Sequence, residues 1–190
     1  KQKKQGKMKN VSVKDVLRLP GEGEKTASDM VIKARTEDLA GDFSVMEGVI
    51  FPHELLAPHT HEHEAQLVYI ITGELEFEVG GKDGIRFTAP TGSYIIKPRG
   101  IMHAFWNKKD VESKYIELSG KEHFERFVDS KSKGDIHAVI HAKDHGMTSH
   151  MKDTIRLMKE HNLKGLSMME SPSFPKLPDW FKDLLPKKAT

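Results

Sequence analysis

Short runs of alternating hydrophobic and polar residues recur through the middle of the chain and predict β-strands. The clearest run is Glu74–Val79, in which Leu75, Phe77 and Val79 alternate with three glutamates. Such alternation gives a strand one apolar face and one charged face. Similar patterns predict further strands at 43–51, 67–72, 93–97, 103–107 and 114–118. Many short strands separated by turns favour an all-β sandwich or barrel.

The spacing of apolar residues becomes helical after residue 120. Helices are predicted at 121–128 and 151–161, and a proline-rich segment follows them. The first residues are polar and contain no clear strand. We therefore expect a flexible polar N-terminal segment, a barrel, and a helical and Pro-rich extension packed on the barrel, at 1–26, 27–119 and 120–190 respectively.

The composition is typical of a soluble globular protein. Hydrophobic residues make up 37% and charged residues 31% of the chain, with no long apolar run that could span a bilayer. The formal net charge of +2 is too small to indicate a nucleic-acid partner, and no DNA-binding domain is recognisable. No apolar segment follows the N-terminal lysines, so we expect no intact secretory signal and a cytoplasmic protein. The absence of cysteine excludes disulfides, thiolate zinc sites and cysteine nucleophiles.

Histidines in two segments carry the candidate chemistry. His59 and His61 are two residues apart, so on a strand they share a face. Two neutral imidazoles on one face can chelate a divalent ion. His103 follows a Pro-x-Gly turn in the second segment, 92–107. The same stretch contains Trp106, whose opposite parity predicts that it packs outside the metal pocket.

The spacing of these two segments resembles the two sequence motifs of cupins. The second motif, G-x5-P-x-G-x2-H-x3-N, matches at every fixed position from 92 to 107. The first motif ends H-x-H-x4-E-x6-G, and Gln66 stands where most cupins have glutamate, while His53 replaces its leading glycine. The resemblance covers about residues 40–120. It implies a double-stranded β-helix, or jelly-roll barrel, with a metal ion in its mouth held by His59, His61, Gln66 and His103.

An alternative register would pair His61 with His63. The fourth ligand would then fall on Leu67 or Val68, neither of which can coordinate a metal ion. The first register leaves His63 at the pocket rim and makes Glu64 a candidate acceptor for a histidine N–H. A barrel that keeps its histidines without binding a metal is the other alternative.

The glutamine influences the expected chemistry. Three imidazoles and an amide leave the full charge on a divalent ion, which favours polarising a carbonyl, carboxylate or enolate oxygen over redox chemistry. The pattern resembles cupins that open the ring of unsaturated uronates and some cupin polyketide cyclases. The extension after the barrel is similar to that of quercetinase-like single-domain cupins, which usually keep the glutamate as their base.

Three functional hypotheses follow. The first is an isomerase, lyase or cyclase that uses one divalent transition metal ion (Zn, Ni, Fe, Mn or Cu) on a small oxygenated substrate, with His63 or Tyr69 moving a proton. The second is a metal-dependent dioxygenase of the quercetinase-like type. The third is a non-enzymatic cupin that binds or senses a small ligand. The resemblance also implies a homodimer, with neither nucleic acid nor membrane as a partner.

Two further patterns remain open at this stage. Histidines four residues apart at His137, His141 and His145 would form a stripe on a helix, which is either a second metal site or a polar helix face. Aromatic residues in the predicted strands are candidates for the barrel interior or its mouth, at Tyr69, Phe77, Tyr94 and Phe105.

Overall fold

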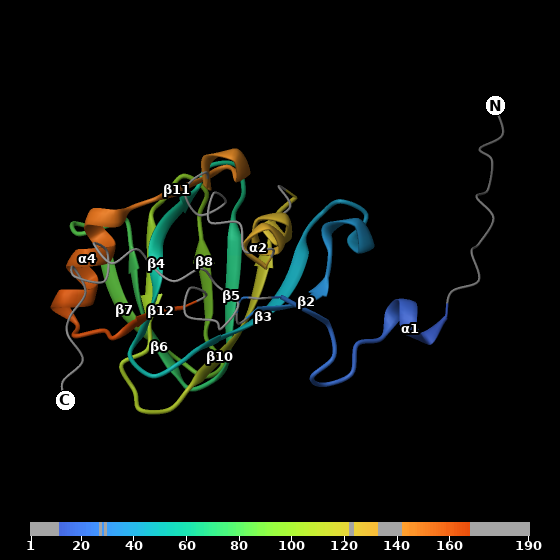
Figure 1. The fold of residues 1–190 in the computed structure, drawn as a ribbon, viewed down its shortest axis with the longest axis horizontal. Helices are drawn as coiled ribbons and strands as arrows, with labels where there is room; N and C mark the ends of the chain where they lie inside the picture. The colour runs from blue at the N-terminus through green and yellow to red at the C-terminus, as the bar shows by residue number, and fades with distance from the viewer. Residues whose placement is uncertain (1–11, 27, 29, 122–123, 133–141, 168–190) are drawn as a thin grey trace.

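The computed structural model describes residues 12–26, 28, 30–121, 124–132 and 142–167, which contain two β-sheets packed face to face (Figure 1). Sheet A consists, in spatial order, of β1 (Glu24–Lys25), β2 (Met30–Ala34), β3 (Ser44–Ile50), β10 (Ser113–Ser119), β5 (Gln66–Thr72) and β8 (Tyr94–Lys97). Sheet B consists of β11 (Met147–Ser149), β4 (Glu54–His61), β9 (His103–Trp106), β6 (Glu74–Val79) and β7 (Ile85–Pro90), and β12 (Gly165–Leu166) also pairs with β4. The expected all-β jelly-roll barrel is therefore confirmed.

The six strands predicted from alternation all form, each within one residue of its expected ends. The helix expected at 151–161 is α4 (Met151–Glu160), and the one expected at 121–128 is α2 (Phe124–Ser132). Shorter elements include α1 (Val13–Val16) and the 3-10 helices η1 (Thr36–Leu39) and η2 (Ala142–His145). Alternation did not predict β2, β4, β7 or the short strands β1, β11 and β12, because their sequences lack a clear period of two along their length.

The main core lies between the two sheets. Alternate residues of each strand point inward, so β3 and β10 are buried at every second position. Phe105 packs against Phe77 and Tyr115, with ring centroids 4.9 Å and 5.2 Å apart. Phe77 and Phe105 therefore occupy the barrel interior, as expected of these two aromatic residues.

The helix α4 covers the outer face of sheet B, where a second apolar cluster forms (Figure 1). Leu157 and Met158 of α4 pack against Leu55 and Trp106, and all four are buried. Trp106 also stacks on His161 with centroids 4.5 Å apart. This confirms that Trp106 lies outside the pocket, because it faces away from the barrel interior.

Two positions of the first sequence motif, residues 73 and 53, lie in loops and have a positive φ. Gly73 has a φ of 83°, and a Cβ there would lie 2.4 Å from Ser113 Oγ, so only glycine fits without a rearrangement. His53 has a φ of 61°, in the left-handed region that glycine prefers. The backbone at this motif position therefore has a conformation that favours glycine, although the residue is histidine.

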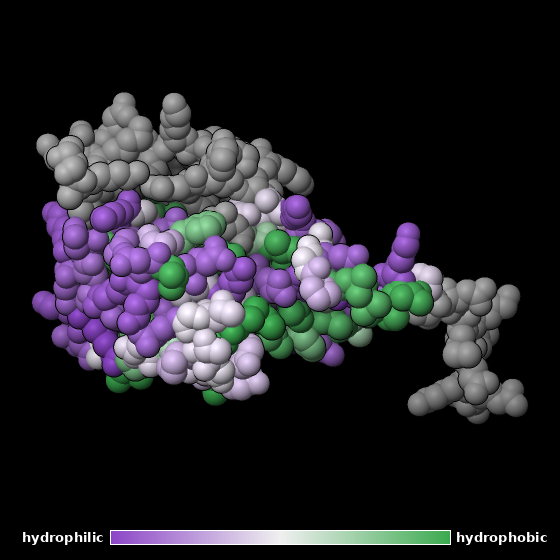
Figure 2. Space-filling view, turned by 90° about the horizontal axis from the view of Figure 1, so that it is seen from below, coloured by the Kyte–Doolittle hydropathy of each residue, from purple (hydrophilic) through white to green (hydrophobic). Residues whose placement is uncertain are grey.

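Residues 12–22, which contain α1 and which we call the N-terminal arm, project away from the sheets in Figure 1. Hydrophobic side chains gather toward the end that carries the arm in Figure 2, whereas the opposite end is largely hydrophilic. The exposed apolar residues of the arm are Val13, Val16, Leu17 and Leu19. Among the described residues, no helix has the length and apolar character needed to cross a membrane.

Candidate metal centre

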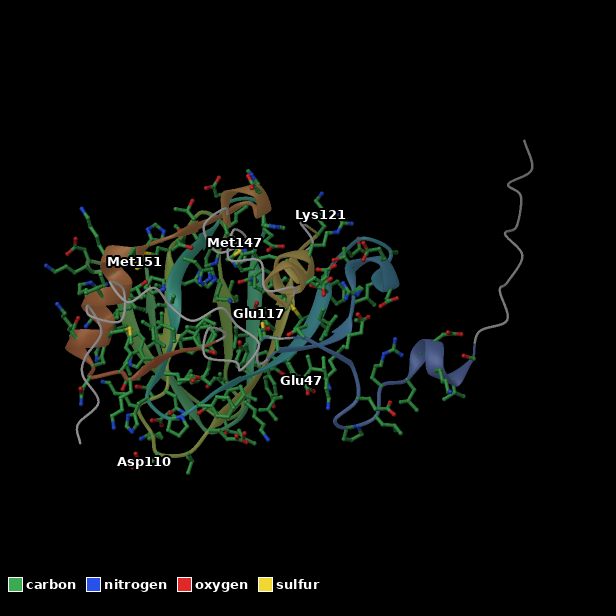
Figure 3. All side chains as sticks on the ribbon, viewed as in Figure 1. Glu47, Asp110, Glu117, Lys121, Met147 and Met151 are labelled. Carbon is green, nitrogen blue, oxygen red and sulfur yellow. The ribbon has the colours of Figure 1, made fainter. Side chains whose placement is uncertain are left out.

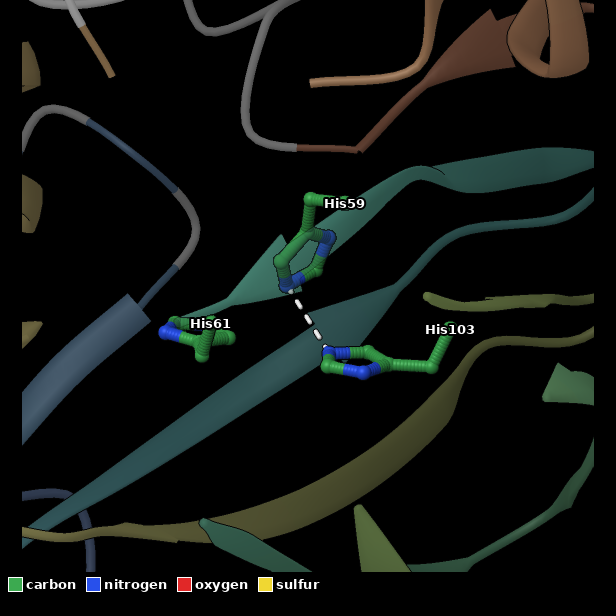
Figure 4. Close-up of side chains that lie close together, drawn as sticks. All are labelled: His59, His61 and His103. Atoms are coloured by element: carbon green, nitrogen blue, oxygen red, sulfur yellow. Dashed lines mark hydrogen bonds between the residues drawn. The ribbon is translucent and has the colours of Figure 1, made fainter. Parts of the chain in front are cut away.

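Three histidines from two neighbouring strands of sheet B converge inside the barrel. His59 and His61 lie on β4, and His103 lies directly opposite His59 on β9. One ring nitrogen from each residue lies within 4.8 Å of the others, and all three side chains are buried. The two Nε2 atoms of His59 and His103 are 3.1 Å apart, with the ring of His61 beside them (Figure 4).

The outer nitrogen of each imidazole is held by a hydrogen-bond acceptor. Nδ1–H of His59 donates to the carbonyl of Ala57 at 2.8 Å, and Nδ1–H of His103 donates to the carbonyl of Ile101 at 3.1 Å. Nδ1 of His61 lies 2.9 Å from a carboxylate oxygen of Glu64. A carbonyl or carboxylate only accepts, so each neutral ring carries its proton on Nδ1 and its lone pair on Nε2.

The facing Nε2 atoms of His59 and His103 are consequently both acceptors. Two lone pairs directed at each other across 3.1 Å repel, and a cation bound between them removes that repulsion. The acceptor contact of Glu64 to His61 was anticipated from the sequence. Carbonyl or carboxylate groups behind metal-binding imidazoles are the usual arrangement in such sites.

Burial keeps two of these imidazoles, His61 and His103, uncharged. Burial, with a smaller contribution from the positive charge of Lys97, lowers the pKa of His61 to about 3, against an opposing effect of Glu117. Burial also lowers the pKa of His103 well below its ordinary value, helped by His59 and Lys97. At neutral pH both of these rings are thus in the neutral form that binds metal ions.

Gln66 points into the barrel from β5, on sheet A. Its Nε2 donates to Glu117 Oε1 at 3.1 Å and to Ser119 Oγ at 2.8 Å. Its Oε1 is buried without a hydrogen-bond partner among the described residues, and so is Nε2 of His61. Buried acceptors without donors are costly unless a ligand satisfies them. An imidazole nitrogen and an amide oxygen in this state fit a divalent transition metal ion.

Sequence reasoning missed a buried ion pair beside this glutamine. Nζ of Lys97 on β8 lies 2.6 Å from Glu117 Oε2 on β10, and the two side chains are 0% and 3% exposed. Lys97 also lies over the ring of Phe105, 5.6 Å from its centroid. Figure 3 labels Glu117, which is a buried position of β10. The sequence did contain a signal for this pair. Lys97 is two residues from Ile95 and Glu117 is two residues from Tyr115, so on a strand each charged residue shares the face of an apolar neighbour.

Apolar side chains enclose the histidines from the C-terminal extension. Phe124 of α2 packs its ring against His61, with centroids 5.0 Å apart, and Phe127 packs on Phe124. Both rings are buried and belong to the same core cluster as Met147 of β11. The apolar side predicted for this helix therefore covers the barrel next to the candidate metal centre and keeps water from His61.

The two residues expected to move a proton differ in where they lie relative to the histidines. His63 is exposed in the loop after β4, close to Gly146. Tyr69 lies on the outer face of β5, because the buried positions of that strand are Gln66, Val68 and Ile70. Its ring contacts Tyr94, with centroids 4.7 Å apart. The structure therefore does not bring Tyr69 to the histidines, and both tyrosines are outside the barrel interior.

The other histidine pattern falls mostly outside the described residues. His137 and His141 lie in the part of the chain that is not described. His145, at the end of η2, packs edge-on against Phe127 with centroids 5.5 Å apart. The described histidines that converge on one point are therefore those of β4 and β9.

Comparison with known proteins agrees with this architecture. Residues 47–119 match a family model described as a cupin domain. Protein SchB of Streptomyces halstedii is 29% identical over 83 residues, which are 43% of this chain and 58% of SchB. The match thus spans less than two thirds of that relative's length.

Solved structures of similar fold are more distant in sequence. KdgF from Halomonas sp. is 22% identical, with a TM-score of 0.45 over 51% of this chain and 81% of KdgF. A predicted oxalate decarboxylase from Thermotoga maritima is 19% identical, with a TM-score of 0.47 over 56% of this chain and 98% of that protein. At this level of similarity neither structure bears on activity.

Proposed function

Because the barrel of this protein is a cupin domain, we propose that it holds one divalent transition metal ion and acts as an enzyme on a small oxygenated molecule. The proposed ligand atoms are Nε2 of His59, His61 and His103, together with Oε1 of Gln66. The observation that carries the proposal is the pair of acceptor nitrogens facing each other at 3.1 Å, each fixed by an acceptor behind it.

Four uncharged ligands suit a particular chemistry. When bound, the ion supplies a Lewis acid that polarises a carbonyl, carboxylate or enolate oxygen. The protein's own residues orient the imidazoles through Glu64 and two backbone carbonyls. Phe124 and Phe127 keep water away from one side of the site. Exposed His63, two residues beyond His61, is the proposed group that accepts or returns a proton at the mouth.

This arrangement favours an isomerase, lyase or cyclase. Gln66 cannot accept a proton at neutral pH, so it cannot serve as the base that a glutamate would provide at that position. The dioxygenase hypothesis depends on such a base, and the carboxylate that contacts Gln66, that of Glu117, is engaged by Lys97. Consumption of oxygen during turnover would nevertheless identify a dioxygenase.

The decisive test is the metal content of protein purified without chelator and without a nickel column. We expect about one ion per chain in the wild type and none in His61→Ala. His63→Ala is the matched control, because it removes a neighbouring exposed histidine and also tests the alternative register. Loss of metal in His63→Ala with retention in His59→Ala would reverse the ligand assignment. A wild type that binds no metal after reconstitution would leave the ligand-binding or sensor hypothesis.

A further inference from the structure

Two charged side chains occupy the interior of the barrel, where each is costly to bury. Lys97 and Glu117 come from strands on either side of β5 and pair at 2.6 Å, almost fully excluded from solvent. Removing two charges from water costs about as much as their attraction returns, so such a pair contributes little net stability. Its location beside Gln66 indicates a role in the metal site.

The pair determines how the Gln66 amide is oriented. One oxygen of Glu117 is engaged by the Lys97 ammonium and the other accepts from Gln66 Nε2 at 3.1 Å. A carboxylate can only accept, so the amide must turn its NH2 group toward it. Ser119 Oγ accepts the second N–H at 2.8 Å. The carbonyl oxygen is the amide atom that remains without a partner.

We infer that Glu117 is a positioning residue, paired with Lys97, that holds Gln66 so that its carbonyl oxygen and not its NH2 group is available to the metal ion. The inference rests on the metal site of the proposed function. An amide with the opposite orientation would direct two N–H groups at a cation and could not bind it. The same contact explains why residue 66 is glutamine, because a glutamate there would set two carboxylates against each other.

The first test measures metal affinity by competition with a chromophoric chelator, using Co(II) and Zn(II). Lys97→Met/Glu117→Gln removes both charges and leaves no unpaired ion in the barrel. We expect affinity to fall about 10- to 100-fold, as for other residues that support metal ligands. The visible spectrum of the Co(II) protein should change as well, because the oxygen ligand is no longer held.

The matched control is Arg156→Met/Glu78→Gln. Glu78 is also a fully buried strand carboxylate paired with a cation, but it lies on the outer face of sheet B against α4. This variant should lose stability and keep the wild-type metal affinity and Co(II) spectrum. An equal loss of affinity in both variants would overturn the inference by showing a general effect of destabilisation. Ser119→Ala is a milder variant that removes one acceptor and should lower affinity several-fold with little effect on folding.

A charge exchange tests the orientation itself in the metal-free protein. Gln66→Glu should lower the melting temperature, and adding Glu117→Gln to it should restore most of that loss. In the wild-type background, Glu117→Gln alone should lower it, because Lys97 is left without its partner. If Glu117→Gln lowers the melting temperature in both the wild-type and the Gln66→Glu background, the proposed contact is contradicted.

The outcomes separate the two levels of the argument. If His61→Ala abolishes metal binding while Lys97→Met/Glu117→Gln binds like the wild type, the metal site stands and the role of Glu117 is wrong. If the wild type itself takes up no metal while the charge exchange behaves as expected, the contact stands and the proposed function fails.

Discussion

Glu64 and His61 form a buried contact in which a carboxylate oxygen lies 2.9 Å from Nδ1 of the ring. The two side chains are only 4% and 2% exposed, and they are three residues apart across the end of β4. The other two imidazoles of the centre are backed by neutral carbonyls. Glu64 is thus the anionic support among the three, and it increases the donor strength of His61.

Replacing this support should weaken metal binding. We expect Glu64→Ala to reduce affinity about 10- to 100-fold, because Nδ1 of His61 loses its acceptor and the ring its fixed tautomer. A chelator competition titration measures the change. Glu62→Ala is the control, since Glu62 is a neighbouring exposed carboxylate that contacts Thr148. Similar losses in the two variants would mean that local charge and not the contact matters.

Removing the metal should make stability depend on pH. The folded-state pKa of His61 is about 3, and that of His103 is also lowered. In the unfolded chain both imidazoles have the ordinary pKa of histidine, so they bind protons there at higher pH than in the folded protein. The two neutral histidines therefore contribute fully to the free energy of unfolding above about pH 6.5. As the pH falls toward the folded-state pKa, this contribution decreases by about 1.4 kcal/mol per pH unit for each histidine. Urea unfolding in chelator between pH 7.5 and 5 measures this slope. In His61→Asn the free energy of unfolding should depend less steeply on pH, because one of the two histidines no longer contributes. Identical slopes in the variant and the wild type would argue against a lowered pKa of His61.

The cluster between α4 and sheet B should stabilise the fold without influencing the metal. Leu157 is fully buried there, so Leu157→Ala should lower the free energy of unfolding by about 2–5 kcal/mol. Metal affinity should not change, because this cluster lies on the face of sheet B that points away from the histidines. Met151→Ala, at a position 45% exposed on the same helix, should cost much less. Comparable losses in both variants would contradict this packing.

The homodimer expected from the sequence remains a prediction, and the outer face of sheet A offers a surface for it. An apolar row of register neighbours crosses four strands of sheet A and consists of Ile96, Leu67, Leu118 and Val45. Tyr94 and Ile96 are 70% and 69% exposed. We expect light scattering to give twice the mass of one chain, because such a face is suited to self-association.

Tyr94→Lys/Ile96→Lys should convert this dimer to monomer. Ile85→Lys, at an exposed position on β7 of the other sheet, should leave the mass unchanged. A monomeric wild type, or dissociation by the β7 variant alone, would show that the face of sheet A is not the interface.

The sequence by itself determined the strand pattern, the fold class and the three histidines. Alternation along Glu74–Val79 and the two-residue spacing of His59 and His61 are local properties, carried by the period of a strand. His103 was joined to them by the resemblance to the two cupin motifs. Side chains two apart on one strand share a face wherever that strand lies. For this reason His59, His61 and His63 were expected to share a face, and the resemblance to the cupin motif, rather than parity, favoured His59 and His61 as the ligand pair.

Only the tertiary structure decided which distant residues meet at the inner face of β5. Residues 67–71 are apolar throughout, because that strand faces the core on one side and the apolar row on the other. No alternation therefore marked Tyr69 as external. The pairing of Lys97 with Glu117 depends on β8 and β10 lying on either side of β5, which is a matter of register between strands. Local periodicity specifies direction within one strand, whereas contacts between strands are determined by how the whole barrel closes.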